Sequence, residues 1–319
     1  MSRIGAGEPS TETKIVLVKR QTRLQELVIR YNTIQQAEFY VERLGADFGD
    51  YVREDRVYQA ALAEAAEVLG RIGRVQQVDR EFVPNFIFGE RDLVVVLGQD
   101  GLVANTLKYA ADQPLIGVNP DPQRWDGALL PFTVRDLSAV VGDLLRGRRP
   151  LREVRLAQAE LNDGQVLVAV NDLFIGRRTH VSARYVLRLN GAAEQQSSSG
   201  IIVSTGMGST GWLRSVLAGA AGIASGAAGQ PAAPLAPDAS FGWDSPYLYF
   251  TVREPYPSRS TAANLVFGRI DEGGPLKIVS QMPESGVIFS DGVESDYLEF
   301  GSGVEATIKL AERRGRIVV

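Results

Sequence analysis

Residues 92–97 read DLVVVL, an apolar run without the alternation of polar and apolar side chains that a half-exposed strand shows. A strand of this kind must be covered on both faces, which is typical of parallel sheets flanked by helices. Strand and helix signals alternate around it, from KIVLVK at 14–19 through PLIGV at 114–118 to a helical pattern over 137–145. This alternation predicts a doubly wound parallel sheet, with ligands binding beyond the carboxyl ends of its strands.

The remaining elements expected in this half are helices over 34–44, 60–69 and 102–111 and a strand over 75–78. After about residue 150 the pattern changes to short segments separated by turns rich in Gly, Asn, Asp and Pro. This predicts an antiparallel β-rich domain, with strand segments at 152–161, 165–170, 183–190, 247–252, 264–270, 275–280 and 304–310. One helix, from Ser209 to about Ala224, is expected within this domain, and the Pro-bearing stretch that continues to residue 240 is expected to form a mobile loop.

These patterns divide the chain into three parts. We expect a disordered lead at 1–13, an α/β domain at 14–148 and a β-rich domain at 149–319. A length of 319 residues is sufficient for two domains of ordinary size.

The composition excludes several function classes. A formal net charge of −4 provides no basic field for nucleic acid, and the absence of cysteine excludes disulfides and thiolate metal sites. The single histidine, His180, disfavours a Ser-His-Asp triad or a multi-histidine zinc site. No apolar stretch reaches the ~20 residues that a membrane helix needs, and the N-terminus lacks the apolar core of a secretory signal. We therefore expect a cytoplasmic enzyme with no membrane or nucleic-acid partner.

The buried strand ends in the turn GQDG at 98–101, directly before a helical stretch. Glycine at 98 and 101 lets backbone N–H groups approach a phosphate closely, and a helix that begins there adds the positive end of its dipole. Asp100 would then lie beside a hydroxyl that must lose its proton. The alternative is that Asp-Gly only forms a turn and Asp100 only caps the helix.

A second glycine turn lies in SSSGIIVSTGMGSTGW at 197–212, after a short apolar strand. Its residues combine backbone freedom, hydroxyl groups and a helix N-terminus, and they are Thr205, Gly206, Gly208, Ser209 and Thr210. The turn has neither the Gly-Lys-Ser/Thr ending of a Walker loop nor the dinucleotide-binding fingerprint. A plain Ser/Thr helix cap with glycine spacing is the alternative.

The loop GVNPDPQRWDG at 117–127 follows the fourth strand. Asn119, at the end of the strand, could hydrogen-bond a polar ligand or simply tolerate the dihedral angles of a proline-bracketed loop. Arg23 and Arg124 could each meet a phosphate, although a solvated arginine is the commoner outcome.

Taken in order, four motifs resemble those of NAD kinases, in the NAD kinase and diacylglycerol kinase superfamily. They are GQDG at 98–101, GVN at 117–119, NDLFIG at 171–176 and STGMGSTGW at 204–212. The likeness is greatest to the mitochondrial-type enzymes and their bacterial relatives, on GVNPDPQRWDG, on SSSG at 197–200, on VREP at 252–255 and on SDG at 290–292. It covers most of residues 14–310.

The resemblance implies an N-terminal α/β domain and a C-terminal β-rich domain with the active site between them. It implies transfer of a phosphoryl group from ATP, with Mg²⁺, to the 2′-hydroxyl of the adenosine ribose of NAD, in a homodimer or higher homo-oligomer. Asp100 matches the catalytic acid that contacts this hydroxyl. The other matching positions would shape its loop or bind NAD and the nucleotide: Gly98, Gln99, Gly101, Asn119, Asn171, Asp172, Thr205, Gly206, Gly208, Ser209 and Thr210. The resemblance identifies no metal ligands in this chain.

Gln99 is the main departure from the family pattern, which has glycine at this position. If that glycine adopts a positive φ or lets a phosphate pass close by, glutamine obstructs both. Alternatively, Gln99 could turn its amide toward a phosphate. Gln99 is the feature that favours a nucleotide-binding sensor with weakened or lost catalysis over an active NAD kinase. A third possibility keeps the fold and changes the acceptor to a sugar or lipid hydroxyl.

Overall fold

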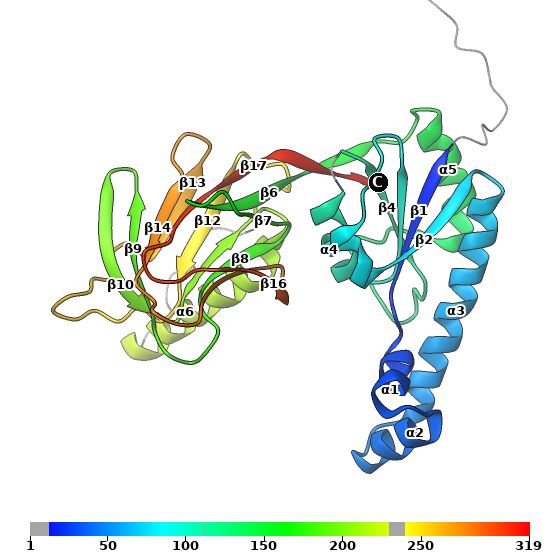
Figure 1. Cartoon of the computed structure of the whole chain (residues 1–319), viewed down its shortest axis with the longest axis horizontal. Coiled ribbons are helices and arrows are strands. Elements are labelled where there is room, and N and C mark those ends of the chain that lie inside the picture. Colours follow the sequence, from blue (N-terminus) through cyan, green and yellow to red (C-terminus); the bar gives the residue numbers. More distant parts are fainter. Residues whose placement is uncertain (1–12, 111, 230–239) are drawn as a thin grey trace, which may run out of the picture. The chain divides into compact units, whose positions relative to one another are not determined.

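The computed structural model describes residues 13–110, 112–229 and 240–319, and the described chain forms two compact units. The first unit contains the residues up to Arg152 together with Arg316–Val319, and the second contains Glu153–Gly315 (Figure 1). The chain end thus belongs to the first unit, whereas the sequence placed all of 149–319 in the β-rich domain. The expected lead, apart from Thr13, and most of the expected loop before residue 240 lie outside the described residues.

A parallel sheet in the order β2-β1-β3-β4 forms the centre of the first unit. Its strands are β1 (Lys14–Lys19), β2 (Arg74–Asp79), β3 (Leu93–Leu97) and β4 (Pro114–Asn119). At the outer edge of β4, the short strand β5 (Phe132–Thr133) pairs with its last residues, and the end of β17 (Glu305–Val318) pairs with its first. The doubly wound parallel sheet predicted from the sequence is confirmed.

Helices cover this sheet, as the apolar strand at 92–97 requires. All five residues of β3 are buried. On one face, side chains of β1, β3 and β4 pack against α3 (Phe48–Gly70) and α5 (Leu137–Leu145). The helix α4 (Asp100–Tyr109), which follows β3, contacts β3, β4 and the 3-10 helix Arg80–Asn85.

Two helices precede α3, and only one of them was expected. The structure contains α1 (Arg23–Tyr31) and α2 (Ile34–Arg43), and it begins α3 at Phe48 rather than near residue 60. A capping box begins α1: the Thr22 side chain accepts a hydrogen bond from the Gln25 amide, and the Gln25 side chain bonds the Thr22 amide in return. This pair of residues is the local signal for α1 that the sequence contains.

The second unit is a pair of β-sheets that share one core. One sheet is antiparallel, in the order β13-β12-β11-β8-β15-β16. Its strands are β8 (Asp172–Arg177), β11 (Ile201–Ser204), β12 (Tyr247–Val252), β13 (Phe267–Asp271), β15 (Gly286–Ser290) and β16 (Val293–Glu299). The other layer consists of β6 (Leu151–Leu161), β7 (Val166–Ala169), β9 (Ala183–Leu189), β10 (Ala192–Ser198), β14 (Leu276–Ser280) and most of β17.

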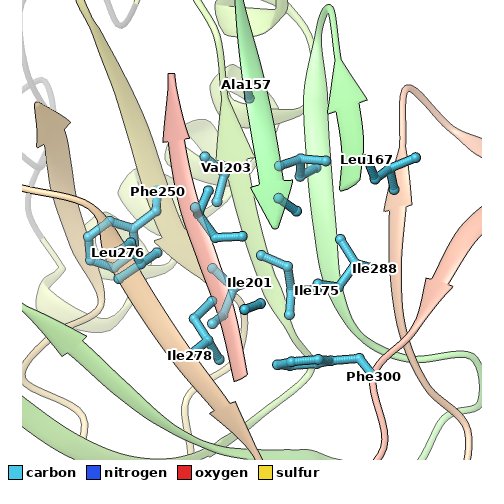
Figure 2. Packing of buried hydrophobic residues seen from close by; sticks show 14 of the residues in the cluster. Ala157, Leu167, Ile175, Ile201, Val203, Phe250, Leu276, Ile278, Ile288 and Phe300 are labelled. Atoms are coloured by element: carbon cyan, nitrogen blue, oxygen red, sulfur yellow. The ribbon is translucent and has the colours of Figure 1, made fainter. Parts of the chain in front are cut away.

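Apolar side chains from both layers interdigitate in this core (Figure 2). Ile175 and Val203 come from the first sheet, and Leu276 and Ile278 from the second layer. The antiparallel β-rich architecture is therefore confirmed, although β8, β10, β15 and β16 were not expected as strands. The helix expected from Ser209 is α6 (Trp212–Ala228), which a 3-10 turn at Gly208–Thr210 precedes. Within the described residues, no helix is long and apolar enough to cross a membrane.

Candidate functional site

The carboxyl ends of β1 and β3 are joined through Tyr58, a buried residue of α3. Its hydroxyl donates to the Leu97 carbonyl at 3.0 Å and accepts a hydrogen bond from the Arg20 amide at 2.9 Å. Burial raises the pKa of Tyr58 to about 12. The phenol therefore keeps its proton and fixes the edge of the sheet from which the GQDG turn begins.

Gln99 occupies the N-cap of α4 in an extended conformation, with φ −118° and ψ 163°. Its carbonyl accepts hydrogen bonds from the amides of Leu102 at 2.8 Å and Val103 at 3.2 Å. Any amino acid can adopt these dihedral angles, so the turn does not need glycine at this position for its backbone geometry. Glutamine therefore does not obstruct this turn by requiring a positive φ, which was one of the two obstructions considered from the sequence.

Asp100 is the first residue of α4, and the backbone holds its carboxylate in place. One oxygen accepts the Leu129 amide at 2.8 Å, and the other accepts the Ala128 amide at 3.2 Å. A side chain on Gly101 would meet no atom within 4 Å. The two amides thus hold the Asp100 carboxylate at the N-terminus of α4. Amides at a helix N-terminus have no partner within the helix, and the helix dipole favours an anion there.

Asn119 holds the loop that supplies those two amides. Its side-chain nitrogen donates to the Trp125 carbonyl at 2.8 Å, and its oxygen accepts the Asp121 amide at 3.0 Å. Gly117 completes the arrangement, because a Cβ at this position would lie 2.0 Å from the Leu129 carbonyl oxygen. The structure thus places Asn119 at the end of β4 as a support for the loop, through its side chain rather than through unusual dihedral angles.

In the second unit, the turn STGMGST packs against the segment that leads into β8. The Thr205 hydroxyl donates to the Val170 carbonyl at 2.5 Å and accepts the Gly208 amide at 3.1 Å. A Cβ on Gly208 would lie 2.1 Å from the Asn171 carbonyl oxygen, and one on Gly206 would lie 1.9 Å from the Gly242 carbonyl oxygen. Both glycines are therefore required by close backbone packing rather than by a positive φ.

The two hydroxyl residues that follow in this turn differ in exposure. Ser209 is buried, and its hydroxyl donates to the Gly206 carbonyl at 2.7 Å. Thr210 is exposed. Hydrogen bonds that the Thr205 and Ser209 hydroxyls donate thus stabilise the turn, whereas the Thr210 side chain faces solvent.

Asp291 is the central residue of the SDG motif at 290–292 and was not among the predicted site residues. Its carboxylate accepts the Asn171 amide at 2.6 Å and the Val170 amide at 3.0 Å, and its own amide donates to the Asp172 carbonyl at 2.9 Å. Asp291 has a positive φ of 53°. An Asp-Gly pair at the end of a strand was the available signal, since this pair is typical of such turns.

Asp172 lines a pocket of about 280 Å³ that lies wholly within the second unit. Burial raises the pKa of this carboxyl to about 7, and the neighbouring charge of Asp291 adds to the effect. Phe174 stacks on Trp212 in the pocket wall, with ring centroids 5.7 Å apart. The other lining residues are Arg177, Arg178, Arg253, Phe289 and Gly292. Aromatic rings, arginines and one carboxyl are together suited to a planar ligand that carries negative charge.

We expect Asp172→Asn to remove a pH-dependent loss of stability in the second unit. Between pH 3.8 and about 7 the folded protein binds more protons at this carboxyl than the unfolded chain does. The free energy of unfolding of the wild type therefore falls as the pH rises through this window. Thermal unfolding should show no gain for the variant near pH 4 and its full gain above pH 7. Equal unfolding curves for Asp172→Asn and the wild type above pH 7 would contradict the account.

The predicted residues fall into two groups. One group lies at the carboxyl edge of the parallel sheet and consists of Gly98, Gln99, Asp100, Gly101 and Asn119. The other group lies in the second unit and consists of Asn171, Asp172, Thr205, Gly206, Gly208, Ser209 and Thr210. His180 is exposed and belongs to neither group. Among the described side chains, no cluster of three or more His, Cys, Asp or Glu is arranged to hold a metal ion.

Comparisons with known proteins identify the fold. No protein-family model and no curated protein sequence matches the chain. Among solved structures, it resembles an NAD kinase from Archaeoglobus fulgidus in complex with ATP, with a TM-score of 0.55 and 16% identity, over 96% of this chain and 94% of that one. It also resembles yeast NADH kinase complexed with NADH, with a TM-score of 0.55 and 14% identity, over 96% of this chain and 83% of that one. The chain therefore has the two-domain fold of these NAD kinases.

Proposed function

We propose that this chain, which has the fold of NAD kinases, is an ATP-dependent kinase that phosphorylates the 2′-hydroxyl of the adenosine ribose of NAD to give NADP. The observation that carries the proposal is the Asp100 carboxylate, fixed by two backbone amides at the N-terminus of α4. The ligands of the two solved structures, ATP and NADH, support the choice of donor and acceptor.

In the proposed reaction, Asp100 is the general base. Its carboxylate accepts the proton of the 2′-hydroxyl as the ribose oxygen forms a bond to the γ-phosphorus of ATP. The bond from this phosphorus to the β,γ-bridging oxygen breaks, and ADP leaves. Among the described residues, one amide donates to each carboxylate oxygen, so lone pairs remain for the hydroxyl. Phosphoryl transfer depends mainly on positioning and charge neutralisation, so a chain with one histidine and no cysteine can perform it.

The second unit would bind the dinucleotide. In this proposal, the turn from Thr205 to Thr210 shapes the nucleotide site, and the pocket beside Asp172 receives one ring of the substrate against Trp212. Guanidinium groups in the same pocket would meet its phosphates.

The residues present are compatible with Mg²⁺ that binds chiefly through the substrate. Mg²⁺ commonly keeps several waters and is held by one or two carboxylates plus substrate phosphates rather than by a full protein cage. The absence of a larger carboxylate cluster from the described residues fits this mode. When bound, the ion would neutralise charge on the phosphates; the proposal places Asp100 beside the acceptor hydroxyl.

We expect Gln99→Gly to leave the rate of NADP formation within about fivefold of the wild type, which corresponds to about 1 kcal/mol in the activation barrier. The extended backbone of Gln99 is the reason, because glycine is not needed there. Steady-state assays of the variant and the wild type test this. Activity in Gln99→Gly from an inactive wild type would instead favour the sensor, whose supporting feature is this glutamine.

The experiment that tests the proposal is incubation of the purified protein with NAD or NADH, Mg²⁺, and ATP or polyphosphate, followed by chromatographic assay of NADP or NADPH. We expect product from ATP. NAD binding without product from either donor would overturn the kinase assignment and favour the sensor. Phosphorylation of a sugar or lipid hydroxyl in place of NAD would reassign the acceptor.

A further inference from the structure

The β4–β5 loop (residues 120–131) carries both the amides that hold Asp100 and an arginine that reaches a distant helix. Near its end, the amides of Ala128 and Leu129 bond the Asp100 carboxylate. Earlier in the same loop, the Arg124 guanidinium donates to Asp50, in the first turn of α3. The loop therefore connects the candidate base, Asp100, to Asp50 in the first turn of α3.

Asp50 accepts hydrogen bonds from arginines of two elements, α1 and the β4–β5 loop. Arg23, the first residue of α1, donates to the same Asp50 oxygen at 2.7 Å and also bonds Glu54. Hydrogen bonds from Arg124, and then from Arg23, lower the pKa of Asp50 to about 2. Asp50 is thus an anion at any pH near neutrality, and its pairing with Arg124 persists there.

The segment between Arg124 and the two amides has little freedom to absorb a displacement. The amides of Arg124 and Trp125 both donate to the Asp121 carbonyl, at 3.0 and 3.1 Å. Gly127 adopts a positive φ of 61°, and its carbonyl accepts the Leu130 amide at 3.0 Å. Backbone hydrogen bonds therefore fix the loop both at Arg124 and Trp125 and at Gly127, next to residues 128 and 129.

We propose that Arg124 and Asp50 are positioning residues for Asp100, and that their ion pair fixes the β4–β5 loop so that its amides hold the Asp100 carboxylate in register. This inference rests on the proposed function only for its effect on catalysis. The side chains of Arg124 and Asp50 are 24% and 33% exposed, and a partly exposed pair of this kind contributes little to global stability. Its effect is accordingly on the placement of the loop rather than on folding.

Arg124→Gln tests the inference, because it keeps a donor side chain and removes the charge. We expect kcat for NADP formation to fall about tenfold to a hundredfold, the range that small misplacements of reacting groups produce, with KM for NAD changed by less than about threefold. Arg124→Lys should recover most of the rate. The matched control is Arg53→Gln, since Arg53 lies 3.5 Å from the other oxygen of Asp50 but is not part of the loop; its rate should equal that of the wild type.

Hydrogen exchange provides a readout that does not depend on kinase activity. In Arg124→Gln, peptides covering residues 126–131 should exchange faster than in the wild type and in Arg53→Gln, with an unchanged melting temperature. Unchanged exchange in these peptides would overturn the inference, even if the wild type proved to be a kinase. If the wild type makes no NADP, the proposed function fails, and faster exchange confined to this loop would still establish the positioning role. General destabilisation of Arg124→Gln, with no rescue by lysine, would assign the pair to folding and overturn the inference.

Discussion

Asp100→Asn is expected to lower the rate of NADP formation at least about a hundredfold, the lower end of what a positioned general base contributes. The amide cannot accept the 2′-hydroxyl proton. It also replaces one acceptor oxygen with an N–H₂ group that would face the amide of Ala128 or Leu129. Initial rates at saturating NAD and ATP are the measurement, with a melting curve to show that the fold is retained.

The control for this substitution is Asp112→Asn, an exposed residue that lies before β4 and outside the β4–β5 loop. Its rate should remain within about twofold of the wild type, since surface substitutions away from special features have small effects. If Asp100→Asn retained the rate of the wild type, Asp100 would be only a helix cap that binds the loop, and another group would have to act as the base.

Gly208→Ala is expected to destabilise the second unit by about 3 kcal/mol or more, at the upper end of overpacking costs. A Cβ at this position would lie 2.1 Å from the Asn171 carbonyl oxygen, which is backbone and has no rotamer to change. The segment before β8 and the STGMGST turn would have to separate, and the hydrogen bond from the Thr205 amide to the same carbonyl would be strained. Denaturant unfolding measures the loss of stability. NAD binding measures the effect of the displaced turn on the proposed nucleotide site.

Gly219→Ala provides the matched comparison within α6. A Cβ there meets no atom within 4 Å, and alanine in an exposed helix interior should stabilise by about 0.8–1 kcal/mol. Opposite signs for the two substitutions are therefore expected. Equal unfolding midpoints for Gly208→Ala and the wild type would show that the turn does not pack against Asn171 as described.

Local sequence patterns identified most of the fold because buried strands and long helices carry strong signals. The apolar run at 92–97 predicted a sheet covered on both faces, and β3 is buried throughout. The helix α1 was not predicted, although Thr22 and Gln25 have the spacing of a capping box. The strands β8 and β15 were not predicted because they are only six and five residues long. These signals are local, but each is weaker than a long periodic pattern.

Contacts between distant segments could not be predicted in the same way. Nothing near Asp100 indicates that the amides of Ala128 and Leu129 bind its carboxylate, or that Asp291 binds the amide of Asn171. The φ of Gln99 likewise depends on how β3 enters α4 in the folded chain. Motif order could suggest which residues matter, whereas their partners depend on tertiary packing.

The most direct test of the central claim is transfer of label from [γ-³²P]ATP to NAD by the purified protein, with the product digested to locate the phosphate on the adenosine ribose. The account predicts labelled NADP that carries the phosphate at the 2′-position, with Asp100→Asn nearly inactive in the same assay. Absence of label from NAD and NADH, while NAD still binds, would contradict it.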